Sequence, residues 1–225
     1  MEQNNISRVC VYVDGSNFYH IVLKKLGVKD TEFDYEALTK YLVGNEILGE
    51  SGKRYYVGTV QAQNNIPNEA FSRQQALFTY LRSHNWEIKH SPLRKRVEEV
   101  VIDDRIDAYE KIKAIGINII KVERWREKGI DVKLAVDLMV GAIDNKYDTA
   151  IVVSSDTDLV PAIDWVRKRG RKTVEYVGFS IPDKYNSEND TKPTNSLIKA
   201  SSLTKVLLST DIESFIHKKP SISQL

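Results

Sequence analysis

The chain has 225 residues, of which 41% are hydrophobic and 28% charged, a composition typical of one large or two small α/β domains. The net charge of +2 does not indicate nucleic-acid binding by itself, so such a function needs a local basic patch. No apolar run approaches the ~18 residues of a membrane span, and we therefore expect a cytoplasmic protein without a transmembrane helix.

The first predicted strand is Val9–Val13, a β-branched and aromatic run that ends at Asp14. It contains the single cysteine, Cys10, which we expect to be a buried structural thiol without an internal disulfide. A short turn then leads into a helix over Asn17–Leu26, which Gly27 stops. An aspartate therefore lies where a buried strand is followed by a helix.

Helices and strands alternate over the next part of the chain. Asp34–Val43 is a predicted helix that begins at a capping aspartate, and a loop follows over Gly44–Gly52. Arg54–Gln61 is a predicted strand, Glu69–Ser83 a helix, and Trp86–His90 a second short strand. This β-α-β rhythm predicts a parallel sheet covered by helices.

Residues 93–126 do not follow that rhythm. They begin with the basic run at 94–96 and continue with mixed charge. Apolar residues at helical spacing predict a helix here, with one face formed by Ile102, Ile106, Tyr109, Ile112 and Ile115. Ile117–Val122 predicts a strand. We interpret the whole segment as an insertion or a lid.

The next helix is predicted after Gly129, with Asp131 at its N-cap and its end near Ile143. In a helical projection it is apolar almost all round, which predicts packing on most sides. The exception is a narrow strip: Lys133, Asp137, Gly141 and Asp144. Asp137 either pairs with Lys133 one turn away or faces an acidic pocket, and the sequence leaves both readings open.

A buried strand over Ala150–Val153 is followed by two more aspartates, Asp156 and Asp158. Both could simply cap the helix that comes next. However, the pattern repeats that of the first strand and Asp14, and ligands of open parallel sheets bind where the strands end. The repeated pattern favours one shared acidic edge.

The C-terminal part continues with the basic stretch Arg167–Lys172, a strand over Thr173–Val177, and a polar segment over Gly178–Asn195 that we expect to be a mobile loop. The remaining predicted elements are Leu197–Ser201, Leu203–Leu207 and a terminal helix over Asp211–His217. No repeat or low-complexity linker divides the chain. We therefore expect one domain over residues 1–225.

Three motifs carry a resemblance to a known family: VDGSN at 13–17, KGIDVKLAVDL at 128–138, and VVSSDTDLVPAIDWVRKRGRKTV at 152–174. Together they closely resemble the NYN domain, in its LabA-like branch, a member of the PIN-like nuclease fold. The resemblance implies a Rossmann-like, three-layer α/β/α sandwich with a mainly parallel sheet. The chain departs from many relatives at Ser155 and Thr157, where they have glycine, and at Leu159, where they have phenylalanine.

The resemblance also implies a catalytic set: Asp14, Asn17, Asp131, Asp137, Asp156 and Asp158. Four of these are the expected ligands of one or two Mg²⁺ or Mn²⁺ ions: Asp14, Asp131, Asp156 and Asp158. Clustered carboxylates would repel an anionic phosphodiester unless divalent cations lay between them, and hard oxygen ligands suit these two metals. Asp137 would be an additional ligand or a support, while Asn17 and Ser155 would orient water or phosphate.

Basic side chains would bring nucleic acid to this edge, although each basic run is also consistent with ordinary solvated charge. The candidates are Arg94, Lys95, Arg96, Lys133, Arg167, Arg169 and Arg171. We expect a structural role for His20, which lies one helical turn after Asn17.

The resemblance implies a metal-dependent endoribonuclease, a hydrolase whose partner is RNA, and the sequence gives no reason to expect a membrane partner. Three alternatives stay open: a nuclease that acts on DNA, a phosphatase that uses the same metal chemistry, and a non-catalytic module that binds nucleic acid or serves regulation. A homodimer also stays open, because no apolar patch in the sequence decides the oligomeric state.

Overall fold

The computed structural model describes residues 7–60, 68–126, 128–184 and 186–217. Its strands are β1 (Arg8–Asp14), β2 (Ile47–Thr59), β3 (Glu87–Pro92), β4 (Arg94–Val101), β5 (Ile119–Arg126), β6 (Thr149–Val153), β7 (Thr173–Ser180) and β8 (Leu203–Leu208). Six of them form a central sheet in the order β3-β2-β1-β6-β7-β8, in which all neighbours are parallel. The predicted parallel sheet is therefore confirmed.

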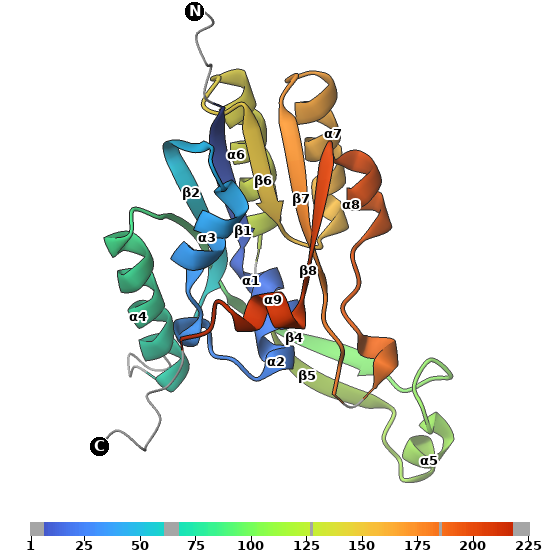
Figure 1. Ribbon diagram of the computed structural model, residues 1–225. Helices are drawn as coiled ribbons and strands as arrows, with labels where there is room; N and C mark the ends of the chain where they lie inside the picture. Colours follow the sequence, from blue (N-terminus) through green and yellow to red (C-terminus); the bar gives the residue numbers. More distant parts are fainter. Residues whose placement is uncertain (1–6, 61–67, 127, 185, 218–225) are drawn as a thin grey trace, which may run out of the picture.

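Helices cover both faces of the sheet, which gives the three-layer α/β/α arrangement of a PIN-like fold (Figure 1). The helices are α1 (Gly15–Phe18), α2 (Lys24–Leu26), α3 (Tyr35–Val43), α4 (Glu69–Ser83), α5 (Tyr109–Ala114), α6 (Ile130–Ile143), α7 (Val160–Lys168), α8 (Asn195–Ala200) and α9 (Ser209–Glu213). A π-helical segment joins α1 to α2. Among the described helices, none is long and apolar enough to cross a bilayer.

Strand alternation assigns the side chains of β1 to two separate cores. Val9, Val11 and Val13 pack with α1, α3, α4 and α9 on one face. Cys10 and Tyr12 pack with α6, α7 and α8 on the other face. Both sets are fully buried, as a central strand of a parallel sheet requires. The expectation that Cys10 is a buried free thiol is confirmed.

The register of the sheet determines which polar residues meet at its edge. Val13 of β1 is paired with Val153 of β6, so Asp14 and Ser154 are the next residues on two parallel neighbours. The helix that precedes β6, α6, runs antiparallel to the sheet and therefore begins at the same edge. This carboxyl edge of the sheet collects residues from positions near 14, 131 and 155.

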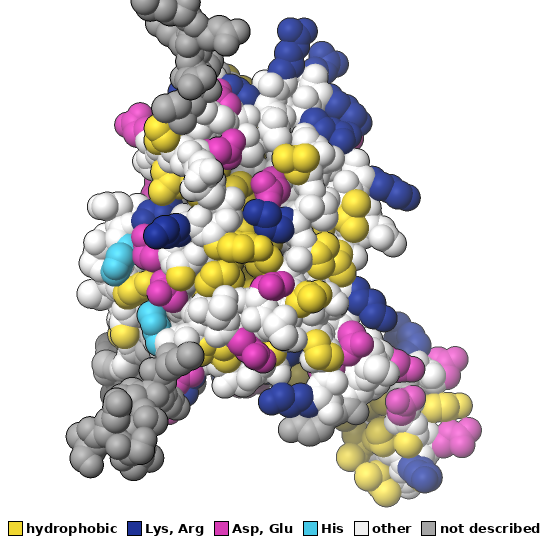
Figure 2. All heavy atoms as spheres, in the orientation of Figure 1, with side chains coloured by type: hydrophobic (Ala, Val, Ile, Leu, Met, Phe, Trp, Pro, Cys, Tyr) yellow, Lys and Arg dark blue, Asp and Glu magenta, His cyan; other side chains and the backbone are white. Residues whose placement is uncertain are grey.

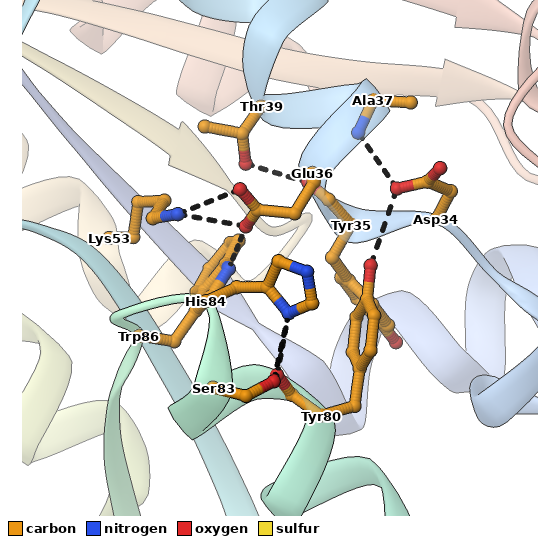
Figure 3. Close-up of polar contacts among 10 residues, drawn as sticks. All are labelled: Asp34, Tyr35, Glu36, Ala37, Thr39, Lys53, Tyr80, Ser83, His84 and Trp86. Atoms are coloured by element: carbon orange, nitrogen blue, oxygen red, sulfur yellow. Dashed lines mark hydrogen bonds and ion pairs between the residues drawn. The ribbon is translucent and has the colours of Figure 1, made fainter.

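A buried polar network fixes α3 against β2 and α4 (Figure 3). The carboxylate of Glu36 accepts two hydrogen bonds from Lys53 Nζ, at 2.9 and 2.8 Å, and one from the Trp86 indole, at 2.5 Å. Asp34 caps α3 by accepting from the N–H of Ala37 at 2.9 Å, as predicted. Because burying Lys53 without Glu36 would leave an unpaired charge, this contact holds β2 in place.

Residues 94–126 form an antiparallel hairpin, β4–β5, with α5 near its tip, and we call this segment the arm. The helix predicted over 102–115 is wrong, because only Tyr109–Ala114 is α-helical. Residues 102–108 form bends and turns between β4 and the short helix, so apolar spacing alone did not identify a continuous helix. The arm projects from the carboxyl edge and carries apolar, acidic and basic side chains together (Figures 1 and 2).

The surroundings of α6 also differ from the prediction. Only one face of the helix is buried, through residues such as Leu134 and Leu138. Val132 and Ile143 are each 64% exposed, so the helix is not packed on most sides. Its N-cap is Gly129 in the left-handed conformation, and Asp131 lies one residue inside the helix. The sequence could not distinguish a buried apolar face from an exposed one.

Most other boundaries agree with the sequence. The helix predicted over Glu69–Ser83 is confirmed, and Gly27 ends α2 with φ of 72°. Two predictions fail locally: β2 begins at Ile47 instead of after a loop, and the segment 178–195 contains the end of β7 and an antiparallel bridge between Ile181 and Thr191. Both differences extend ordered backbone pairing into segments predicted as loops.

The arm should be separable from the sheet, because β4 and β5 pair with each other and not with the six parallel strands. Arg94 and Arg126 are direct antiparallel partners, about 5 Å apart, so an Asn-Gly turn can replace residues 95–125. We expect the midpoint of thermal unfolding to change by less than about 4 °C, the shift that corresponds to roughly 1 kcal/mol. Calorimetry that shows loss of cooperative unfolding would contradict this.

Candidate metal centre

The carboxylate of Asp14 is held from two sides at the end of β1. Its Oδ1 accepts the N–H of Asn17 at 3.0 Å, and its Oδ2 accepts the hydroxyl of Ser154 at 2.9 Å. Only 3% of Asp14 is exposed. Hydrogen bonds to a carboxylate favour its charged form, so burial is offset by these donors. Asp14 therefore has a fixed position and few alternative orientations.

A further hydrogen bond joins the ends of β1 and β6, and another orders the turn after β6. The side-chain Oδ1 of Asn17 accepts the N–H of Ser155 at 2.9 Å. The Ser154 hydroxyl, which donates to Asp14, accepts the N–H of Asp156 at 3.1 Å. The Asn17–Ser155 bond, like the Ser154–Asp14 bond, joins two motifs that the sequence separates by about 140 positions, whereas the Ser154–Asp156 bond lies within the turn after β6. The turn after β6 is thus positioned by the turn after β1.

Three carboxylates converge at this point. Asp14, Asp131 and Asp156 each offer one oxygen, and these oxygens all lie within 4.8 Å of one another. They line an open pocket of about 240 Å³ together with Ser16, Asn17, His20 and Ile130. Oxygens at this separation can be bridged by one small divalent cation, for which carboxylates are suitable hard ligands. The donor set therefore fits Mg²⁺ or Mn²⁺.

The charges in this cluster repel one another. Partial burial raises the pKa of the Asp131 carboxyl above its usual value, and the nearby charges of Asp156 and Asp158 raise it further. A raised pKa means that the folded protein disfavours the ionised form of Asp131 at neutral pH. A cation between the carboxylates would reverse this repulsion.

Asp158 lies next to the group of three but not within it. Its side chain is exposed, while its N–H donates to Oδ1 of Asp156 at 2.9 Å and so completes the cap of the 3-10 turn Thr157–Leu159. Both readings of the aspartate pair thus have a structural basis. Asp156 caps the turn and also belongs to the carboxylate group.

Asp137 lies farther along α6, six residues or about 9 Å beyond Asp131. Its Oδ2 accepts the hydroxyl of Tyr56 at 2.8 Å and lies 3.9 Å from both Arg54 and Lys89. Burial, followed by the charge of Asp137, raises the pKa of Tyr56. Asp137 is not part of the carboxylate group, and the surrounding cations balance its charge.

Lys133 does not pair with Asp137 among the interactions that the structure describes. Its ammonium group donates to the carbonyl of His90 at 2.7 Å, which holds it beside β3.

The Ser155 hydroxyl oxygen is buried and has no hydrogen-bond partner within the described part of the chain. A buried polar atom of this kind calls for a ligand or a water molecule.

The two basic runs are far apart in the structure. In the arm, Lys95 pairs with Glu123 at 2.8 Å and Arg96 is exposed, while the side chain of Arg94 lies outside the described residues. The run from 167 to 172 follows α7 back to the start of β7, at the amino edge of the sheet. The sheet therefore separates it from the carboxylates.

Arg167 is already engaged at that amino edge. It donates to the carbonyl of Ser201 at 3.0 Å and pairs with Asp164 at 3.3 Å. Arg169 and Arg171 are exposed near it. The structure thus does not bring these three arginines to the pocket, because a helix between parallel strands crosses the whole height of the sheet.

His20, for which the sequence favours a structural role over a place in the pocket, lies on the pocket wall with an exposed side chain. Ser16 and Ser154 were not singled out by sequence, although both lie within two residues of a motif aspartate. The sequence did contain a signal that could have identified them. A serine just after a buried parallel strand lies at the same edge of the sheet as the neighbouring aspartate.

The fold and this acidic edge define a PIN-like α/β domain. The family model of the NYN domain matches residues 8–202, and the chain belongs to the NYN family, whose domains are PIN-like nucleases. The resemblance on which the sequence prediction rested is therefore confirmed for the family.

Two known proteins are similar to the chain. One is 6-hydroxy-3-succinoylpyridine 3-monooxygenase HspA from Pseudomonas putida, 25% identical over 194 residues. The match covers 78% of this chain but only 59% of HspA. The other is the crystal structure of VPA0982, a protein of unknown function from Vibrio parahaemolyticus RIMD 2210633. It matches with a TM-score of 0.53 at 18% identity and covers 92% of this chain and 96% of that one, which supports the fold alone.

Replacing Asp131 by Asn should stabilise the metal-free protein and remove its response to metal. The substitution removes a charge that partial burial and then the neighbouring carboxylates disfavour, as the raised pKa of Asp131 reflects, so the unfolding midpoint in EDTA should rise. In the parent, Mn²⁺ at a hundred times its Kd should stabilise by about 2.7 kcal/mol, which corresponds to about 5–10 °C.

The exposed Asp144 on the same helix provides the matched control. Asp144→Asn should keep the full Mn²⁺ response in differential scanning calorimetry. An equal Mn²⁺ response in the parent and in Asp131→Asn would show that the cation binds elsewhere.

Proposed function

We propose that the protein is a metal-dependent ribonuclease that hydrolyses RNA phosphodiester bonds at the carboxyl edge of its sheet. The observation that carries the proposal is the group formed by Asp14, Asp131 and Asp156 in a domain of a nuclease family. A protein that only bound an anion would gain nothing from clustering carboxylates beside it.

Asp14, Asp131 and Asp156 would hold Mg²⁺ or Mn²⁺, and the exposed Asp158 is near enough to add its charge. When bound, the cation supplies Lewis acidity, which activates water and offsets charge on the phosphoryl oxygens. Asp14 contributes rigidity, because Asn17 and Ser154 fix both of its oxygens. A ligand held in one orientation loses less entropy on binding.

Two further residues of the proposed set would act on the substrate. The Oδ1 of Asn17 is used by the N–H of Ser155, and its amide nitrogen has two more hydrogens to donate to a phosphate or water. The buried Ser155 hydroxyl, which has no hydrogen-bond partner among the described residues, would orient a water molecule. Asp137, with its charge balanced by Arg54 and Lys89, would support the position of α6 instead of binding the cation.

The finer parts of the proposal rest on the sequence: on the motifs, on the composition and on the lack of a dividing linker. They include membership of the LabA-like branch, a cytoplasmic location, one domain over residues 1–225 and RNA as the partner. Of the predicted basic contacts, Lys133 and the pair Lys95 and Arg96 fit the proposal, because β3, α6 and the arm all meet at the carboxyl edge. The arginines at 167, 169 and 171 do not.

The proposal is tested by incubating end-labelled single-stranded RNA with the chain, with and without Mn²⁺. Cleavage should require the metal and should fall at least about a hundredfold in Asp14→Asn and Asp156→Asn. Asp144→Asn should cleave like the parent. Activity that persists in both site variants would reject the assignment of residues.

A parallel arm with single-stranded DNA separates the alternatives. Equal or faster cleavage of DNA would identify a nuclease of different specificity. Tight binding of RNA without cleavage of either substrate would identify the non-catalytic binding module.

A further inference from the structure

Three hollows in the surface meet at His20. The carboxylate pocket shares Ser16 and His20 with a second hollow between α1, β2 and α4. His20 also borders a third hollow beside α2. A ligand longer than one phosphate group would therefore extend from the carboxylates into one or both neighbours.

The second hollow is half-enclosed and has a volume of about 340 Å³, which lies within the range of small-ligand sites. Its walls are largely apolar and aromatic: Tyr19, Tyr55, Val57, Val60, Ala70 and Leu93. This apolar lining contrasts with the acidic lining of the carboxylate pocket beside it. It suits the binding of a planar aromatic ring, which is desolvated when it binds.

The wall of this hollow is built on the turn that carries Asp14. Gly15 has no side chain, and a Cβ added there would lie 2.2 Å from the ring of Tyr55. The ring therefore lies directly against the backbone of Gly15, and its hydroxyl is 3.4 Å from that of Tyr35. The aromatic wall and the first carboxylate are thus parts of one rigid unit.

One side of the hollow is polar. Arg73 of α4 pairs with Asp30 at 3.3 Å, which places hydrogen-bond donors and an acceptor next to each other. Gln74 uses both atoms of its amide, donating to the carbonyl of Gly58 at 2.7 Å and accepting from Val60 at 2.9 Å. A fixed wall with a mixed polar edge matches a nucleobase, whose rim alternates donors and acceptors.

The third hollow is basic. It is bordered by Lys24, Lys25 and Lys184 and by a single carboxylate, Asp183. The ammonium group of Lys25 donates to the carbonyl of Asn189, and Lys24 and Lys184 are exposed. Neither predicted basic run includes these lysines, which the fold brings together from positions 160 residues apart.

We propose that the hollow between β2 and α4 binds the base next to the phosphodiester at the carboxylates, and that the lysines bind the backbone on the other side of His20. This inference rests on the proposed function, since it takes the carboxylate pocket as the position of the reacting phosphate. A base inside a duplex cannot enter such a hollow without being unpaired. The substrate is therefore a single strand.

The base site is tested with five-nucleotide RNAs that carry 2-aminopurine at one position each. Ca²⁺ replaces Mn²⁺, so that a divalent cation still offsets the charge of the carboxylates while hydrolysis is slowed, and binding to the full chain is followed by fluorescence. One position should be quenched severalfold, because a stacked 2-aminopurine loses its emission. Ala70→Phe, which fills the hollow, should abolish that quenching and lower kcat/KM with Mn²⁺ about tenfold.

Ser72→Phe is the matched control, because it adds the same ring to an exposed position of the same helix. For the lysines, Lys24→Gln and Lys184→Gln should each reduce the slope of log affinity against log salt by about 0.7. Lys168→Gln, at the amino edge, should leave that slope unchanged.

Equal quenching at all five positions, or equal effects of Ala70→Phe and Ser72→Phe, would overturn the base site. Quenching at one position without any cleavage would support the base site and reject the proposed nuclease. Metal-dependent cleavage that Ala70→Phe leaves unchanged would support the proposed nuclease and reject the base site.

Discussion

The structure depends on the two hydrogen bonds that hold the carboxylate of Asp14. One comes from the N–H of Asn17 in the helix after β1, and the other from Ser154 at the end of β6. They place a charge at 3% exposure and simultaneously lock the ends of two central strands together. Without these donors, burying a carboxylate at that point would carry a much larger desolvation cost.

The positions of the other site residues follow from the way β1 and β6 are paired. Pairing of Val13 with Val153 sets Ser154 beside Asp14, and Ser154 in turn receives the N–H of Asp156. The return of α6 to the same edge adds Asp131. Hydrogen bonds thus position the carboxylates of Asp14 and Asp156, and the start of α6 brings Asp131 beside them. This grouping of negative charges lowers the stability of the metal-free protein, and a bound cation would offset their repulsion.

The sequence was sufficient for the parts that depend on short patterns. Two buried strands that end in aspartate predicted the acidic edge, and the β-α rhythm predicted the parallel sheet. The sequence was insufficient where the burial or conformation of a segment depended on which other parts of the chain pack against it. The exposed Val132 side of α6 and the arm are examples, because apolar spacing is the same for buried and exposed faces.

Runs of basic residues in the sequence were also a poor guide to which basic side chains lie near the carboxylates. The arginines at 167–171 form the densest basic run, but α7 carries them to the amino edge, where Arg167 is bound by Ser201 and Asp164. The lysines at 24, 25 and 184 are scattered in sequence and gather beside His20 only in the fold. A basic surface is a property of tertiary structure, so local composition is a weak guide to it.

The most direct test of the central claim is anomalous diffraction from crystals of the protein soaked in Mn²⁺. The account predicts a strong peak within bonding distance of carboxylate oxygens from Asp14, Asp131 and Asp156. A peak at another place on the surface, or no peak at concentrations that stabilise the protein against heat, would contradict it.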